Sequence, residues 1–378
     1  MKRILIFSLA YFPHIGGAEI AIKEITDRIS SDEVSFDMVT LRFEKSSLAF
    51  EKIGNVNVYR IGSSGSRIQK LFFPLAAFIK ARSLHRHSHY DVIWSIMANY
   101  AGFAALFFKY HFLRVPFLLT LQEGDPIPEI KHKVRFVYPL FRRIFSRADY
   151  IQTISNYLAD WARQMGAVSQ ITVVPNGVNV RVFNDKDLVS IDELRKNLGY
   201  KQNDVLLITT SRLVDKNAVE DIIESLKFLP ESVKLLILGT GPLGGRLKLR
   251  VESLKLEERI KLIGYVSHEN LPLYLWTSDI FTRPSLSEGM GNSFIEAMAA
   301  GLPVIATPVG GIVDFLKDGE TGLFCEVHNP KSIAEKVQIL ISDRNLRDRI
   351  VSNAKVLVAT SYDWKGISER MKKIFESM

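Results

Sequence analysis

The chain has 378 residues, of which 47% are apolar and 24% are charged. This composition is typical of a folded globular protein and excludes a disordered one, and the length predicts two domains rather than a single core. The formal net charge of +8 is uneven, because residues 1–183 hold 23 Lys and Arg against 14 Asp and Glu, whereas residues 184–378 hold 26 against 27. A basic first half favours an anionic partner, such as phospholipid head groups or a polyanionic acceptor.

The cysteine content and the first residues indicate the compartment. Cys325 is the single cysteine, which excludes an intrachain disulfide and favours a reducing environment. The start, MKRILIFSLAYFP, resembles a signal peptide, but it leads into Pro13 and a glycine pair rather than a cleavage site. It is interpreted as a first parallel strand. No apolar run approaches the ~20 residues that span a bilayer, so the expected location is the cytoplasm, with peripheral attachment to the inner face of the cell membrane left open.

The first half alternates short apolar runs with helical patterns. Continuous Val, Ile and Leu runs separated by helices predict a parallel sheet that helices cover on both faces. The predicted strands are residues 4–9, 36–41, 56–61, 92–96, 117–121, 150–154 and 171–174.

The second half repeats this pattern after a turn signal at residues 175–177. The fold prediction is therefore α/β, with two Rossmann-like doubly wound parallel-sheet domains, residues 1–182 and 183–360, whose strands point their carboxyl ends at a cleft. Residues 361–378 have the spacing of an amphipathic helix. The predicted strands are residues 205–210, 234–238, 261–263, 279–282 and 304–306, and helices are expected to start near Ala218, Leu243, Leu271, Ser293 and Ser332.

Residues 283–311 contain the pattern that is most informative about function. A strand end, a glycine-bearing turn and a helix of good formers leave free backbone N–H groups and a positive helix end, which suit a phosphate or a sugar hydroxyl. Two carboxylates, Glu288 and Glu296, lie eight positions apart across the turn. The alternative is structural, because Ser293 and Glu296 have the spacing of a capping box.

Several features together resemble the signature of the family-4 retaining glycosyltransferases, which have GT-B architecture. They are Glu288 and Glu296 with seven residues between them, the following Ala-Met-Ala segment, and Gly310-Gly311. The likeness runs from Gly16-Gly17 to the Trp364 region. It implies an acceptor-side first domain, a second domain that binds a nucleotide-sugar donor, and a last helix, residues 361–378, that crosses back onto the first domain.

The resemblance also implies the reaction and the roles of the donor-site residues. A hexose-type sugar would pass from a UDP- or GDP-sugar to a saccharide or lipid-linked saccharide. Glu296 would hold the ribose hydroxyls and Glu288 the donor sugar, while Arg212 and Lys216 would stabilise the leaving diphosphate. Arg212 and Lys216 lie one residue closer together than in many relatives. The remaining donor-site residues are Gly16, Gly17, Gly239, Gly241, Tyr265, Val266, Gly289, Met290, Gly291, Asn292 and Ser293.

Some of these assignments have a structural alternative. Gly16 and Gly17 would bring backbone N–H groups close to the diphosphate, or they could simply begin a helix. Tyr265 and Val266 would contact the base through their backbone, or they could form an ordinary strand end.

The acceptor side departs from the family pattern. Many relatives carry a His near the position of Gln122 or Glu123, and none is present here. Glu123 or Asp125 could orient the acceptor hydroxyl or accept its proton, or either could only cap a loop. With no placed carboxylate nucleophile, the leaving phosphate would take the acceptor proton in a front-face displacement. The metal-type Asp-x-Asp sequence at residues 185–187 follows no strand, so neither a metal nor another cofactor is expected.

Two basic segments, residues 68–87 and 131–147, mix Lys, Arg and His with large apolar residues. They could lie in a membrane interface, or they could bury an apolar face and solvate a basic one. The histidines at positions 85, 87 and 89 are interpreted as a surface stripe rather than a metal site.

Other functions remain as alternatives. A nucleotide-sugar 2-epimerase of the same architecture would need acid and base groups but no acceptor. A nicotinamide-dependent oxidoreductase would need a Gly-x-Gly-x-x-Gly sequence after an early strand, and residues 15–19 do not supply it. Nucleic-acid binding is not expected, because no reader motif accompanies the basic half.

Overall fold

The computed structural model describes the backbone of residues 1–378 and every side chain except that of Asn184. The chain divides into two compact units. Unit 1 comprises residues 1–177 and 364–378, and unit 2 comprises residues 178–363. The C-terminal helix therefore belongs to the same unit as the N-terminal half of the chain.

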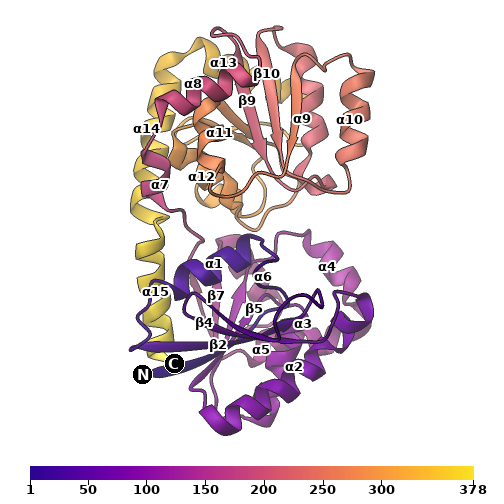
Figure 1. The fold of residues 1–378 in the computed structure, drawn as a ribbon, viewed down its shortest axis with the longest axis vertical. Coiled ribbons are helices and arrows are strands. Elements are labelled where there is room, and N and C mark those ends of the chain that lie inside the picture. Colours follow the sequence, from indigo (N-terminus) through magenta and orange to yellow (C-terminus); the bar gives the residue numbers. More distant parts are fainter. The chain divides into compact units, whose positions relative to one another are not determined.

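Unit 1 is built on an eight-stranded sheet with the order β3-β4-β2-β1-β5-β6-β7-β8 (Figure 1). All strand pairs are parallel except the edge pair of β3 and β4. Its strands are β1 (Lys2–Phe7), β2 (Val34–Leu41), β3 (Phe50–Ile53), β4 (Val56–Ile61), β5 (Val92–Ile96), β6 (Phe117–Leu121), β7 (Tyr150–Thr153) and β8 (Gln170–Val173). Its helices are α1 (Gly17–Thr26), α2 (Arg67–Ser88), α3 (Tyr100–His111), α4 (Ile127–Lys133), α5 (Tyr138–Arg147), α6 (Asn156–Gln164) and α15 (Trp364–Ser377).

Helix α15 completes the core of unit 1. It packs beside α1 on one face of the sheet, whereas α2, α3 and α5 pack together on the other face (Figure 1). Trp364, Ile367 and Met371 lie in the same apolar cluster as the strands, and the ring of Phe375 lies 5.1 Å from that of Trp94. The helical spacing of these residues thus buries one face of α15, as expected for an amphipathic helix.

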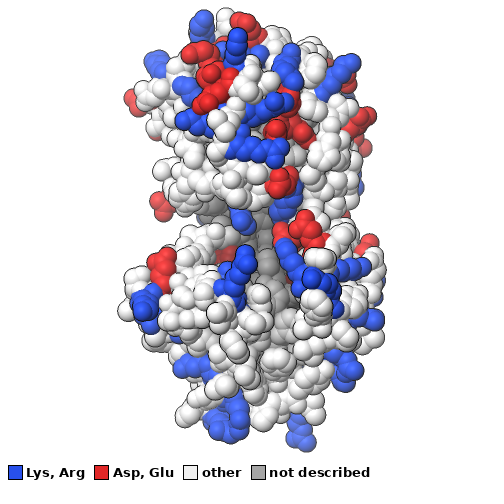
Figure 2. All heavy atoms as spheres, turned by 90° about the vertical axis from the view of Figure 1, so that its right-hand side faces the viewer, with Lys and Arg blue, Asp and Glu red and all other residues white. Residues whose placement is uncertain are grey.

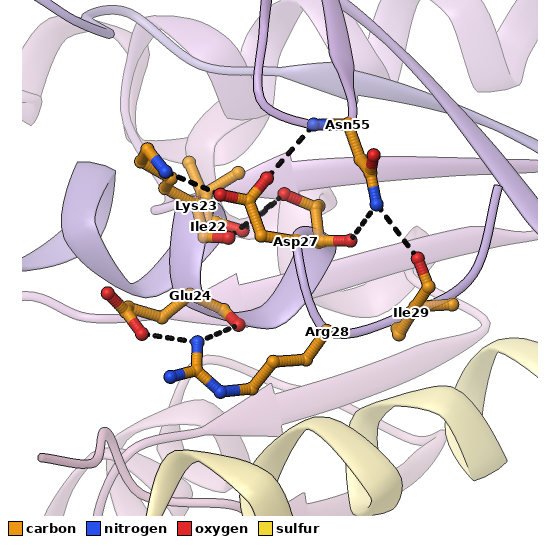
Figure 3. A network of polar contacts seen from close by, with 8 residues as sticks. Ile22, Lys23, Glu24, Asp27, Arg28, Ile29 and Asn55 are labelled. Carbon is orange, nitrogen blue, oxygen red and sulfur yellow. Dashed lines mark hydrogen bonds and ion pairs between the residues drawn. The ribbon is translucent and has the colours of Figure 1, made fainter. Parts of the chain in front are cut away.

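A polar network fixes α1 against the β3–β4 turn (Figure 3). The Asn55 amide donates hydrogen bonds to the carbonyl oxygens of Thr26, at 3.1 Å, and Ile29, at 3.0 Å. The backbone N–H of Asn55 donates to Asp27 Oδ1 at 2.9 Å, and Lys23 is ion-paired with Asp27. These contacts hold the C-terminal end of α1, which follows the Gly16-Gly17 loop.

Unit 2 is built on a six-stranded parallel sheet with the order β11-β10-β9-β12-β13-β14. Helices α9, α10 and α13 cover one face, and α8, α11 and α12 lie on the other (Figure 1). The strands are β9 (Val205–Thr210), β10 (Val233–Leu238), β11 (Ile260–Gly264), β12 (Ile280–Arg283), β13 (Val304–Ala306) and β14 (Leu323–Phe324). The helices are α7 (Val180–Asn184), α8 (Leu188–Asn197), α9 (Val219–Ser225), α10 (Gly244–Ser253), α11 (Leu271–Thr277), α12 (Asn292–Ala300), α13 (Pro330–Ser342) and α14 (Arg344–Ser361).

The α/β fold class with two parallel-sheet domains is confirmed. The predicted strands at residues 56–61, 92–96, 117–121, 205–210 and 304–306 have the predicted bounds. Two strands were not predicted. Strand β3 is an antiparallel edge strand with no buried residue, and β14 has only two residues.

Candidate functional site

Arg283, at the end of β12, organises the turn that carries Glu288. Its guanidinium is buried and forms an ion pair with the Glu288 carboxylate. It also donates hydrogen bonds to the hydroxyl oxygens of Ser293, at 2.6 Å, and Ser285, at 3.2 Å. The guanidinium carbon lies 4.2 Å from the centre of the Phe294 ring, a stacking geometry that suits Arg. One side chain therefore ties both ends of the glycine-bearing turn to the sheet.

The charged state of the buried Arg283 guanidinium depends on the carboxylates around it. Burial lowers the pKa of the Arg283 guanidinium, and the negative charges of Glu288 and Glu296 oppose that shift. Removal of either member of a buried pair leaves the other charge without compensation, which typically costs about 3–5 kcal/mol. Arg283 therefore holds the Glu288 side chain in place.

A close backbone approach fixes the other side of Glu288. Gly310 has a φ of +56°, and a Cβ atom at this position would lie 1.9 Å from the carbonyl oxygen of Glu288. The N–H of Gly311 donates a hydrogen bond to the same oxygen at 3.1 Å. Only glycine fits at position 310, for both steric and conformational reasons.

The start of α12 excludes the capping-box interpretation. The helix begins at Asn292 after Gly291, which has a φ of +90°, and no side chain caps it. Ser293 instead accepts a hydrogen bond from Arg283, and Glu296 points to His268. The first N–H groups of a helix have no partner within it, so this end of α12 presents backbone donors and a positive dipole end.

Glu296 is largely buried and contacts a histidine that the sequence analysis did not select. His268 Nε2 lies 3.0 Å from Glu296 Oε1, and the His268 side chain is about half exposed. His268 lies in the loop after β11, at the same sheet edge as α12. Its position four residues beyond a strand end was the available sequence signal.

Two glycines place the loop that carries Arg212. A Cβ atom on Gly239, which has a φ of +129°, would lie 1.9 Å from the carbonyl oxygen of Ser211, and one on Gly241 would lie 2.4 Å from that of Leu213. The Leu213 N–H donates a hydrogen bond to the Thr240 carbonyl at 3.0 Å. The loops after β9 and β10 are therefore in direct backbone contact, and Arg212 is exposed beside them.

Lys216 belongs to the same edge of the sheet. Its carbonyl oxygen accepts a hydrogen bond from the Leu286 N–H at 2.7 Å, and the Asn217 amide donates to the carbonyl of Arg212 at 2.7 Å. The loop with both cations is thus joined to the turn with Glu288. Unit 2 brings all of its predicted donor-site residues to the carboxyl ends of its strands, with Tyr265 exposed after β11.

In unit 1, the glycine pair starts a helix. Gly16 is the residue before α1 and Gly17 is its first residue. The Glu19 carboxylate contacts the backbone of Gly16. This local geometry is that of a helix start, and the diphosphate contact remains a prediction.

Glu123 in unit 1 is a buried carboxyl group that is only partly hydrogen-bonded. Its carboxyl is buried at the end of β6, where Oε1 accepts a hydrogen bond from the Ala98 N–H at 2.6 Å. Among the described residues, Oε2 has no hydrogen-bond partner. Burial raises the pKa of Glu123 to about 7, although the Ala98 N–H opposes the shift. A carboxyl with these properties can exchange a proton near neutral pH.

The neighbours of Glu123 have different environments. Gln122 Oε1 accepts a hydrogen bond from the Asn176 amide at 3.1 Å, and both residues are buried. Asp125 is about half exposed, and one of its carboxylate oxygens lies 3.2 Å from Lys133 Nζ. Glu123 therefore differs from Asp125 in being buried and only partly hydrogen-bonded.

Two sequence features have structural roles. Asp187, from the metal-type sequence, caps α8 by accepting hydrogen bonds from the N–H groups of Val189, at 3.1 Å, and Ser190, at 3.3 Å. His85 lies among aromatic rings, 4.5 Å from Phe112 between ring centres.

The two basic segments differ in the structure. Helix α5 buries Phe141, Ile144 and Phe145 and exposes its arginines, which agrees with the interpretation of a buried apolar face, although Phe136 before this helix is exposed. Helix α2 instead leaves large apolar side chains exposed. In the described part of the chain, no helix is long and apolar enough to cross a bilayer.

Known proteins match almost the full length of this chain. A family model described as Glycosyltransferase Family 4 matches residues 15–182, and one described as Glycosyl transferases group 1 matches residues 190–357. The N-acetyl-alpha-D-glucosaminyl L-malate synthase of Bacillus anthracis is 24% identical over 379 residues, which cover 96% of this chain and 94% of that protein.

Solved structures share the fold over the full length of the chain. Sucrose-phosphate synthase from Thermosynechococcus elongatus has a TM-score of 0.87 and 19% identity, with 100% of this chain and 99% of that chain covered. Anabaena Alr3699/HepE, solved in complex with UDP-glucose, has a TM-score of 0.82 and 20% identity, with 100% of both chains covered.

Proposed function

We propose that this chain, which belongs to the family-4 group 1 glycosyltransferases and has their GT-B fold, moves a hexose-type sugar from a UDP- or GDP-sugar to a saccharide or lipid-linked saccharide. The observation that carries the proposal is the buried network of Arg283, Glu288 and Ser293 beside Glu296 at the start of α12. The binding of UDP-glucose by Anabaena HepE supports a UDP-sugar as the first donor to test.

Unit 2 offers candidate groups for the ribose, the sugar and the diphosphate of the donor. Glu296 would accept hydrogen bonds from the ribose hydroxyls, and Glu288, fixed by Arg283, would accept them from the sugar. Arg212 and Lys216 would compensate the charge on the leaving diphosphate, assisted by the backbone N–H groups at residues 289–293. Backbone hydrogen bonds connect the loops that carry Arg212, Lys216 and Glu288, which supports the proposal that these residues act on one donor.

We infer that the transfer retains the anomeric configuration. In a front-face displacement, the bond between the anomeric carbon and the phosphate oxygen breaks, and the acceptor oxygen bonds to the anomeric carbon from the same side. The acceptor proton moves to the departing phosphate oxygen, so no enzyme nucleophile is required. Arg212 and Lys216 are proposed to supply the positive charge that a metal would otherwise bring to the diphosphate. Glu123, whose pKa burial raises to about 7, is proposed to orient the acceptor hydroxyl. In the alternative route, Glu123 receives the acceptor proton in place of the phosphate oxygen.

A transfer assay tests this proposal. Purified protein is incubated with UDP- and GDP-sugars and with saccharide and lipid-linked acceptors, with and without EDTA, and the anomeric configuration of the product is read by NMR. We expect Glu296→Ala and Lys216→Ala to abolish transfer while the thermal unfolding remains cooperative.

Matched controls are available in the same unit. Glu257→Ala and Lys248→Ala remove exposed charges away from the site and are expected to leave transfer unchanged. Wild-type activity in the Glu296 and Lys216 variants would contradict the proposal. A modified nucleotide sugar that forms without any acceptor would instead identify the nucleotide-sugar 2-epimerase.

A further inference from the structure

Helix α2 exposes a continuous stripe of large apolar side chains. Ile68, Leu71, Phe72, Leu75 and Ile79 follow the spacing of one helical face, and each side chain is 53–69% exposed. We call these five residues the outer face of α2. An exposed apolar stripe of this length is uncommon on a monomeric soluble protein and marks an interaction surface.

The outer face of α2 is not the face that packs against the rest of unit 1. The inner face of α2 buries Phe73, Ala77 and Ala81 against unit 1, and α2 packs on α3. The inner face alone therefore provides the contacts that hold the helix in place. The outer face is apolar for a reason other than the stability of unit 1.

The charge around the stripe indicates the kind of partner. No Asp or Glu occurs between Lys52 and Tyr90, so α2 carries only basic charges. Arg67 and Arg86 lie exposed near its two ends, whereas Lys70 lies on the other side of the helix, with its ammonium 5.5 Å from the centre of the Phe43 ring. In the view of Figure 2, the face of unit 1 shows uncharged areas with more Lys and Arg than Asp and Glu among them.

The end of the neighbouring helix α3 also exposes an apolar and a basic side chain. Leu113, just beyond the end of α3, is 68% exposed and is followed by the exposed Arg114. A surface on which apolar side chains alternate with Lys and Arg matches a bilayer interface, where apolar groups enter the acyl boundary and cations meet anionic head groups. A neutral protein partner would not account for the one-sided charge.

We propose that the outer face of α2 docks unit 1 on an anionic lipid bilayer. The five apolar side chains enter the head-group and acyl boundary, and Arg67 and Arg86 contact the lipid phosphates. The inference rests on the proposed function in one respect, because docking on a bilayer would bring the enzyme to a lipid-linked acceptor. Docking itself requires neither a donor nor an acceptor.

Vesicle co-sedimentation of the full chain tests the docking surface. The vesicles contain phosphatidylcholine either alone or with phosphatidylglycerol, and no nucleotide sugar is added. Phe72→Asp and Leu75→Asp are each expected to reduce partitioning by about tenfold or more, since each side chain loses its burial in the bilayer. Val168→Asp and Leu249→Asp, at side chains that are 86% and 67% exposed elsewhere, are the matched controls and should bind as the wild type does.

The charge requirement is measured separately. Arg67→Gln and Arg86→Gln are each expected to weaken binding to phosphatidylglycerol vesicles by about fivefold at low salt. The same change should be small on phosphatidylcholine alone. Raising the salt concentration should weaken wild-type binding in the same direction.

Three results would overturn the proposal. They are wild-type protein that stays in the supernatant with anionic vesicles, Phe72→Asp protein that binds as tightly as the wild type, and a wild-type dimer in sedimentation velocity that Phe72→Asp converts to a monomer. The last result would assign the stripe to a second copy of the chain. Transfer to a water-soluble acceptor, measured in parallel, separates a failure of docking from a failure of the proposed reaction.

Discussion

Replacement of Glu123 by glutamine isolates the effect of one buried carboxyl on stability. Glutamine keeps the shape and an oxygen that can accept from the Ala98 N–H, but it cannot ionise. In the wild type, burial raises the pKa of Glu123 from 4.5 to about 7. Ionisation is therefore less favourable in the folded protein than in the unfolded chain.

The direction of the effect follows from linkage. Below about pH 4.5 the carboxyl is protonated in both states, and Glu123 imposes no ionisation penalty. As the pH rises to about 7, the unfolded chain releases its proton first, so the folded state loses stability. The difference between a pKa of 4.5 and one of about 7 predicts a penalty of roughly 3 kcal/mol above pH 7. The glutamine variant lacks this penalty.

Unfolding by urea, followed by tryptophan fluorescence from pH 4.5 to 8, measures the difference. Three of the four tryptophans, Trp94, Trp161 and Trp364, belong to unit 1, so the signal reports mainly on the unit that contains Glu123. The free energy of unfolding of Glu123→Gln, relative to wild type, should rise by about 3 kcal/mol across this range. A constant offset between the two proteins at all pH values would refute the reasoning, because an offset reports only hydrogen bonding and packing.

Three further predictions concern unit 2. Gly310→Ala should destabilise the unit by clearly more than Gly319→Ala in thermal unfolding, because a Cβ atom at position 310 meets the Glu288 carbonyl whereas one at position 319 meets nothing within 4 Å; equal shifts would contradict this. Arg283→Met, which leaves Glu288 unpaired, should cost about 3–5 kcal/mol in urea unfolding, and a change below 1 kcal/mol would count against the buried pair. Cys325, whose pKa burial raises to about 12, should resist iodoacetamide at pH 8 until urea unfolds the protein, and rapid labelling of the native protein would be inconsistent with its burial.

The sheet cores were the part of the fold that could be predicted from the sequence. Strands such as β4, β5, β6 and β9 are short apolar runs between helical patterns, and parallel strands covered on both faces leave this signature. Strand β3 lacks it, because Phe50–Ile53 has no buried residue and pairs only at the sheet edge. A strand that pairs with only one neighbour, at the sheet edge, buries too few side chains to leave a recognisable hydrophobic pattern in the sequence.

The candidate site was predicted in its residues but not in its contacts. Glu288 and Glu296 were selected, but the structural alternative, a capping box formed by Ser293 and Glu296, was wrong. The partners of these two side chains in the structure are Arg283 and His268. An arginine that ends a buried strand must find a carboxylate, and this was the missed signal. Pairing across loops depends on tertiary approach, which local spacing does not encode.

Helix α2 shows a similar limit. Its sequence is apolar on both sides, so periodicity could not tell which side packs on the protein. The structure places Phe73 inside and Phe72 outside, although the two residues are adjacent. The spacing alone left two interpretations open for residues 68–87. The exposed side chains show that the outer face does not pack on unit 1, and contact with a membrane stays a prediction.

The central claim, that unit 2 binds a nucleoside diphosphate sugar through Glu296 and its neighbours, is tested most directly by thermal shift. Wild-type protein and Glu296→Ala are melted with UDP, GDP, ADP, CMP or NAD. A ligand at about 100 times its dissociation constant contributes about 2.7 kcal/mol, which corresponds to a rise in Tm of about 5–10 °C for a unit of this size. The account predicts such a rise with UDP or GDP in the wild type and its loss in Glu296→Ala. A rise with NAD alone, or the same rise with UDP or GDP in both proteins, would contradict it.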